Sequence, residues 1–205
     1  MTEVDSGFPS RFNSLRRNKT GTIWLPGSED LDLAPLCNLD QLRLLDVTSE
    51  NAGIFSSGAL EISSVTSAII EAERIGDLSV FSKMINLESL SLDGRRIENL
   101  QAIRCLKGLK EIYLRNRIRG MGNSEIPLKS EMPLVAEDGT LRNLSMLSEL
   151  PNLRKVVFGD NVVADFDSLK NLTNLEELYF DSSPIPSEQL GLLRAALPRR
   201  KIVAD

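Results

Sequence analysis

The stretch that constrains the fold most is residues 87–109, which read LESLSLDGRRIENLQAIRCLKGL. Its apolar pattern begins again after 22 residues and also fits residues 65–87 and 153–175. A period of this length is typical of a solenoid, in which each repeat buries its apolar edge against its neighbours. The sequence therefore predicts one elongated domain with a continuous core. In the best repeat the inward residues are Leu87, Leu90, Leu92, Ile97, Leu100, Ile103, Leu106 and Leu109.

Each repeat contains a short alternating segment followed by apolar residues at every third position. The alternation predicts a strand whose alternate side chains point inward. The three-residue spacing favours tight helical or 3₁₀ turns over one long α-helix. We expect about nine short parallel strands, centred near residues 24, 46, 69, 91, 113, 135, 157, 179 and 202.

Two segments interrupt the pattern. Residues 49–64 add one residue to the period and are rich in Ser and Gly, so we expect an irregular convex loop there. Residues 117–130 contain Gly and Pro and lack the leucines, but Leu134 and Ala136 fall where inward strand residues belong. We therefore expect residues 117–130 to replace a convex segment of about normal length, followed by a strand near Val135.

The pattern LxxLxLxxxxIxxLxxLxxLxxL at residues 87–109 and 153–175 resembles the leucine-rich repeat family. Its 22-residue form is similar to that of bacterial intracellular and phosphatase-regulator-type repeat proteins. The resemblance covers residues 20–203 and implies an α/β solenoid, an arc with a concave parallel β-sheet and convex 3₁₀ or helical turns. The family usually carries Asn at the ninth position of each repeat, where it bonds the turn. Here only Asn161 stands there, so we expect variable turn geometry.

Both ends of the chain are expected to cover the core of the repeats. Residues 1–19 are expected to be an N-terminal cap or flexible segment, and residues 20–186 the repeat array. Residues 187–205 are expected to form a C-terminal capping helix and an edge strand. Ser187 is the expected N-cap of that helix, which should stop before Pro198.

Residue types argue against catalysis. The chain of 205 residues has no histidine, which removes His-based triads and most transition-metal sites. It also lacks GxxxxGK[ST], GxGxxG after a strand, and CxxC. We therefore expect no enzyme activity, no catalytic, cofactor-binding or metal-binding residues, and no small-molecule substrate.

The same sequence suggests a cytoplasmic location. The N-terminus is polar, and no run of 18 apolar residues is present, so we expect no contact with a membrane. Cys37 and Cys105 fit a reducing compartment, because about three repeats separate them and a disulfide cannot span that distance. A formal charge of −5 argues against nucleic-acid binding, which needs a basic surface.

Side chains between the inward leucines should face out of the concave sheet. There they combine aromatic and aliphatic groups with carboxylates, and the single Trp and both Tyr fall in one predicted column. Trp, Tyr and Arg most often dominate binding energy at interfaces. The alternative is that aromatic residues simply favour strands. The candidate partner-binding residues are Trp24, Asp46, Ile69, Glu71, Asp93, Tyr113, Arg115, Glu137, Tyr179 and Asp181.

The carboxylates among these residues predict a protein partner with a basic surface, and a merely solvated acidic face is the alternative. We expect a cytosolic protein-interaction module, in its specific form an inhibitor or immunity protein of a toxin or nuclease. A regulatory or scaffolding subunit of a phosphatase or other enzyme is the alternative function. Arg115, Arg117 and Arg119 form a basic spot that either pairs with acids such as Asp93 or makes a second contact.

Overall fold

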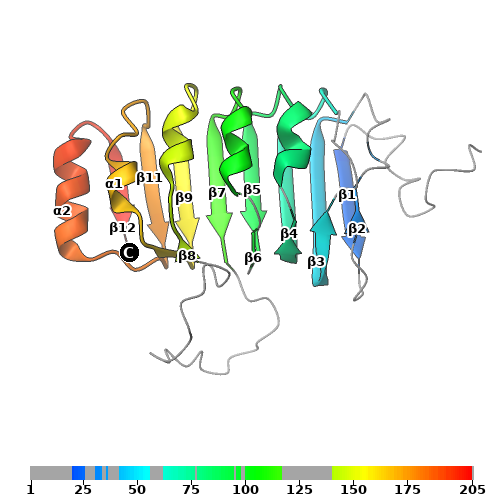
Figure 1. The fold of residues 1–205 in the computed structure, drawn as a ribbon, viewed down its shortest axis with the longest axis horizontal. Helices are drawn as coiled ribbons and strands as arrows, with labels where there is room; N and C mark the ends of the chain where they lie inside the picture. Colours follow the sequence, from blue (N-terminus) through cyan, green and yellow to red (C-terminus); the bar gives the residue numbers. More distant parts are fainter. Residues whose placement is uncertain are drawn as a thin grey trace, which may run out of the picture.

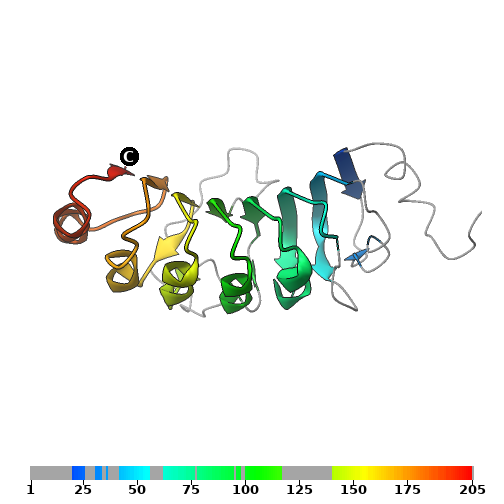
Figure 2. The ribbon, with the colours of Figure 1, turned by 90° about the horizontal axis from the view of Figure 1, so that it is seen from above.

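The structure is a computed structural model that describes residues 20–25, 31–33, 36, 42–55, 62–76, 78–94, 96–97, 100–116 and 140–204. These residues form coils that stack side by side (Figure 1), and the stack bends into a shallow arc (Figure 2). Figure 2 shows two layers, with strands along the upper, concave side and short helices along the lower, convex side. This is the solenoid that the repeat predicts.

The concave layer is a parallel sheet of ten strands within the described residues, and eight of them form its main path. Neighbouring strands run parallel because each coil brings the chain back in the same direction. The path runs through β1 (Thr20–Leu25), β3 (Leu44–Phe55), β4 (Ser67–Ile75), β5 (Ser89–Asp93), β7 (Glu111–Arg115), β9 (Lys155–Gly159), β11 (Glu177–Asp181) and β12 (Lys201–Ala204).

Four two-residue strands complete the β-structure of the described ranges. β2 (Leu31–Asp32) pairs with β3, and β6 (Arg96–Ile97) pairs with β4. β8 (Thr140–Leu141) and β10 (Val162–Val163) form a separate parallel pair. These short strands lie where the chain leaves the concave sheet for the convex side.

The convex layer consists of short helices, as the three-residue spacing predicts. η3 (Leu78–Lys83), η4 (Leu100–Cys105) and η5 (Ser145–Glu149) are 3₁₀ helices, and α1 (Phe166–Leu169) is a single α-helical turn. Because three residues complete one 3₁₀ turn, every third side chain faces the sheet.

The core lies between the two layers and contains the residues that the repeat places inward. Leu87, Leu90 and Leu92 are fully shielded from solvent. In the later coils the rings of Phe158 and Phe180 lie 5.5 Å apart, centre to centre. Each fully buried side chain of this size contributes about 1.5–3 kcal/mol, so the stability of the solenoid is spread along the arc.

One predicted strand is absent from the sheet. β7 pairs directly with β9, and Arg115 stands opposite Gly159, so no strand near Val135 lies between them. In the regular repeat, five positions separate the strand residue Leu92 from the next inward residue, Ile97. The equivalent residues of the interrupted repeat, Leu114 and Leu141, are 27 positions apart. The chain between β7 and β8 therefore contains 22 extra residues, one full period. Because the insertion is one full period long, the later repeats keep the register that the sequence predicts. The insertion nevertheless adds no strand to the main path of the sheet.

The predicted position of Trp24 is also wrong. Trp24 pairs with Thr48, whereas Thr22 pairs with Asp46, so the step from β1 to β3 is 24 residues. The step from Asp46 to Ile69 is 23 residues, as the sequence predicts. Trp24 therefore stands one row away from the column that contains both tyrosines.

The segment after Asp46 is more regular than expected. β3 continues to Phe55, and its end pairs with β4 at Gly53 and Ile54 after a shift of register beyond Ser49. The loop predicted for residues 49–64 is therefore strand as far as Phe55.

Asn161 bonds the turn as the family resemblance implies. It is buried, and its side-chain amide donates to the carbonyls of Leu114 at 2.7 Å and Gly159 at 2.9 Å. Its backbone N–H donates to Ser183 Oγ at 3.0 Å. One residue thus connects the coils that carry β7, β9 and β11.

A second set of asparagines, which the sequence reasoning did not single out, lies just before the strands. Asn86 Nδ2 donates to Ser63 O at 2.7 Å, and Asn152 Nδ2 donates to Lys107 O at 2.9 Å. Asn174 Nδ2 makes the same kind of bond in the next coil. Each bond joins one coil to the coil before it. These bonds between coils partly compensate for the absence of asparagine at the ninth position of the other repeats.

The C-terminal part has the predicted helix and strand. α2 (Ser187–Ala196) ends before Pro198, and β12 pairs with β11. The helix begins one residue earlier than expected, since its N-cap is Pro186 and not Ser187. Pro186 has an extended backbone and makes no side-chain capping bond. Residues 1–19 lie outside the described ranges, so the division into caps and array stays a prediction. In the part of the chain that the structure describes, no helix combines the length and apolar character needed to cross a membrane.

Candidate functional site

Three rows of side chains cross the concave face from β7, two of them as far as β12 and one as far as β11. Register pairing places the members of each row side by side, because parallel strands lie about 4.8 Å apart. The tyrosine row consists of Tyr113, Val157, Tyr179 and Val203. The charged row consists of Glu111, Lys155, Glu177 and Lys201. The glycine row consists of Arg115, Gly159 and Asp181.

The tyrosine row forms the floor of an open groove of about 330 Å³. Val157 is buried between Tyr113 and Tyr179, although it faces the concave side. The direct pairing of β7 with β9 creates this arrangement, since only β9 separates the strands of the two tyrosines. Their Cα atoms are therefore about 10 Å apart. The groove is lined by Tyr113, Arg115, Lys155, Val157, Tyr179, Phe180, Asp181 and Val203.

The charged row holds the tyrosine hydroxyls in place. Tyr113 Oη donates to Glu111 Oε2 at 2.9 Å, and Tyr179 Oη donates to Glu177 Oε2 at 3.1 Å. Lys201 Nζ also donates to Tyr179 Oη. Both rings are therefore oriented before any partner arrives, which lowers the entropic cost of binding.

Lys155 lies between the two aromatic rings. Its Nζ is 5.3 Å from the ring centre of Tyr113, 5.4 Å from that of Tyr179, and 3.8 Å from Glu177 Oε2. A hydrogen bond with Tyr113, aided by Glu111 and Glu177, raises the pKa of Lys155 above the ordinary lysine value despite partial burial. The ammonium group is therefore a fixed positive charge at neutral pH.

The glycine row has a different chemistry. A side chain at Gly159 would place its Cβ 2.9 Å from Arg115 Cγ, so the stem of Arg115 lies over the bare backbone of β9. The guanidinium carbon is 5.5 Å from the ring centre of Tyr113. The expected pairing of Arg115 with Asp93 is not found among the ion pairs of the described residues. Asp181 is exposed at the other end of the row.

The remaining candidate acids lie on the other half of the face. Asp46 and Glu71 are half-buried on β3 and β4, and Thr48 Oγ1 donates to Glu71 Oε2 at 3.5 Å. Asp93 on β5 is 7% exposed, so it offers little surface to a partner. Ile69 is half-buried and belongs to the row that continues into Tyr113. The accessible acids of this half of the described face therefore lie on β3 and β4, whereas β7 to β12 carry charged side chains of both signs.

Two candidates do not join this arrangement. Glu137 lies outside the described residues, and its predicted position between Arg115 and Gly159 does not exist, because those two residues are partners. Trp24 lies on β1, where the structure describes its backbone. The sequence reasoning missed Val157, Lys201 and Glu177 as parts of the site. The alternation pattern placed Val157 and Glu177 on the concave face but gave no sign of their contacts, and it assigned no face to Lys201.

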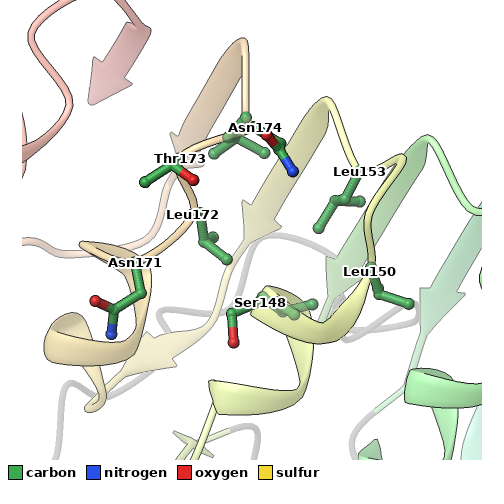
Figure 3. Close-up of a pocket in the computed structure, with 9 residues that line it drawn as sticks. Ser148, Leu150, Leu153, Asn171, Leu172, Thr173 and Asn174 are labelled. Atoms are coloured by element: carbon green, nitrogen blue, oxygen red, sulfur yellow. The ribbon is translucent and has the colours of Figure 1, made fainter.

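A smaller hollow lies at the rim between two coils (Figure 3). Its volume is about 30 Å³, and Leu150, Leu153, Leu172 and Thr173 are among its lining residues. A space of this size holds about one water molecule, so it offers no second binding site for a larger ligand. Within the described ranges, no group of three His, Cys, Asp or Glu side chains is placed to hold a metal ion.

Known structures share this fold. An internalin (inlF) from Listeria monocytogenes matches with a TM-score of 0.58 and 20% identity, over 89% of this chain and 46% of that one. Internalin C2 (inlC2) from the same organism matches with a TM-score of 0.62 and 19% identity, over 91% of this chain and 74% of that one. This chain thus spans about half the length of the first protein. No protein-family model and no curated protein matches the sequence.

At these identities the likeness concerns the fold. The repeat pattern, the parallel concave sheet and the convex 3₁₀ helices agree with it. The chain is a leucine-rich repeat solenoid.

Proposed function

We propose that this chain is a protein-interaction module that binds a partner through its concave face, with the groove between Tyr113 and Tyr179 at the centre. The observation that carries the proposal is the pair of pre-oriented tyrosines beside an open hollow. Aromatic side chains of this kind supply a large share of binding energy at interfaces. The open shape of the groove suits a protein surface, so we propose no catalytic role.

In its specific form, we propose a cytoplasmic inhibitor or immunity protein of a toxin or nuclease. Two observations support it. Asp46 on β3 and Glu71 on β4 are half-buried acids on one part of the concave face, and such a part suits a basic partner surface. Cys105 is an exposed free thiol, which suits a reducing compartment. Charge reversal at Asp46 and Glu71 should weaken such a complex and make it less sensitive to salt.

The test is a comparison of two double variants as affinity baits. Tyr113→Ala with Tyr179→Ala should abolish capture of the partner, because both aromatic anchors are lost. Ile85→Ala with Leu192→Ala removes two exposed apolar side chains outside the concave strands and should leave capture unchanged. Mass spectrometry then identifies the captured protein. Equal capture by the tyrosine variant and the wild type would refute the proposed site, and a captured phosphatase would favour the regulatory-subunit alternative.

A further inference from the structure

The charged groups around the groove fall into a paired set and an unpaired set. In the charged row, Glu177 lies 3.8 Å from Lys155 Nζ and 3.7 Å from Lys201 Nζ. Across the groove, Arg115 and Asp181 make no ion pair within the part of the chain that the structure describes. On the side of the charged row, the lysines and glutamates of the protein therefore neutralise one another. On the side of the glycine row, Arg115 offers a cation and Asp181 an anion.

Arg115 is held in place without an acceptor for one of its donors. Its Nε is buried and has no hydrogen-bond partner in the described structure. Its stem packs over Gly159 and its guanidinium lies beside Tyr113, so the group remains at the groove. A buried charged donor without an acceptor costs free energy. Arg115 as a whole is half-buried and lines the groove, so the open part of its guanidinium can take a carboxylate from a partner there.

We propose that the groove binds a protein segment with a defined order of side chains: a carboxylate for Arg115, an apolar group for the floor at Val157, and a cation for Asp181. This inference rests on the proposed function, since it specifies the partner surface at the same site. The Cα atoms of Arg115 and Asp181 are about 10 Å apart across two strand spacings. A single segment of the partner reaches both.

The pairing within the charged row argues against a general anion site at the groove. Lys155 and Lys201 are already matched by Glu177, with Glu111 close to Lys155. A partner that approached them with a carboxylate would break existing contacts. Arg115 and Asp181 break no ion pair of the described structure when a partner binds, so charge order discriminates between partners there.

The test uses a phage-displayed library of random linear peptides, selected on the full wild-type chain and counter-selected on the Tyr113→Ala/Tyr179→Ala variant. Enriched peptides should carry an acidic and a basic residue on either side of an apolar one. Their dissociation constants are then measured by fluorescence anisotropy. Arg115→Met, which keeps the stem over Gly159, and Asp181→Asn should each weaken binding at least about fivefold. Arg142→Met removes an exposed charge outside the concave strands and should have no effect.

A charge-exchange variant makes the test specific. Arg115→Glu with Asp181→Lys should bind the selected peptides poorly and should prefer peptides whose acidic and basic residues are exchanged. Circular dichroism checks that each variant folds. Peptides that need the tyrosines but bind Arg115→Met and Asp181→Asn as tightly as wild type would overturn the charge-order inference and leave the proposed function standing. Failure to enrich any peptide that depends on the tyrosines would overturn both.

Discussion

At the scale of single residues, Asn161 is the polar side chain on which the largest change in stability is expected. Asn161 is buried just after β9, and its amide bonds two strand carbonyls, Leu114 O on β7 and Gly159 O on β9. Asn161→Ala removes the donor from both carbonyls, but Gly159 O keeps its bond from Asn116 N at 2.9 Å. An unsatisfied buried group costs about 1–3 kcal/mol, so we expect the free energy of unfolding to fall by about 1–3 kcal/mol, measured by urea denaturation.

Asn171→Ala is the matched control. Asn171 is exposed, and its Nδ2 bonds only Asp167 O at 3.4 Å within the described structure. Its removal should change stability by less than about 0.5 kcal/mol. If the two alanine variants unfold at the same urea concentration, the turn does not depend on the Asn161 bonds.

Residue types and alternation predicted part of the site. They placed Tyr113, Tyr179 and Lys155 on the concave face, where the structure has them. They could not place Trp24, because two extra residues between β1 and β3 leave the alternation of each strand intact but move the register. They also could not show that Asp93 is buried, since burial depends on side chains from neighbouring coils.

At the scale of elements, Asp165 joins the short helix α1 to the coil before it. Its Oδ1 accepts from Ser168 N at 3.1 Å, and its Oδ2 accepts from Leu144 N at 2.6 Å. Burial raises the pKa of Asp165, but the hydrogen bonds from Ser168 and Leu144 together outweigh it and lower the pKa below the ordinary value. The carboxylate therefore stabilises the fold above about pH 4, the unfolded pKa, and loses this effect as pH falls through the folded pKa.

Asp165→Asn tests this directly, because an amide group cannot accept both bonds with equal geometry. We expect a loss of about 1–2 kcal/mol at pH 7, and the difference from wild type should shrink in thermal melts below about pH 4. Asp167→Asn changes an exposed carboxylate of α1 that pairs with Lys170 and should cost about 0.5 kcal/mol or less. A wild-type advantage that persists unchanged at pH 2 would contradict the assigned role.

The secondary structure was predictable for a simple reason. Strand alternation and three-residue spacing are local patterns, and both predict the elements that β5, η4 and β9 adopt. The end of β3 was not predictable, because its Ser- and Gly-rich sequence has weak strand propensity and gains its pairing from β4.

At the scale of the whole molecule, the insertion between β7 and β8 shows that the repeat period alone does not predict the number of strands in the sheet. An insertion of one full period restores the register of every later repeat, so the sequence cannot distinguish it from a true coil by position. The pairing of β7 with β9 and the bond from Asn152 to Lys107 O show which coils are neighbours. This rearrangement also brings Tyr113 and Tyr179 to the same groove.

A deletion tests this arrangement of the whole molecule. Removal of residues 118–139 joins Arg117 to Thr140 and leaves the spacing of a regular repeat. We expect the shortened chain to unfold cooperatively with equal or higher stability, by up to about 2 kcal/mol, because a shorter connection costs less entropy to close. Removal of residues 155–176 is the control of equal length, and it deletes β9 and its coil. Since the stability of a solenoid depends on its coils and their interfaces, that variant should be much less stable in urea. Loss of cooperative unfolding in the first deletion, with the second no worse, would mean that residues 118–139 belong to the core of the array.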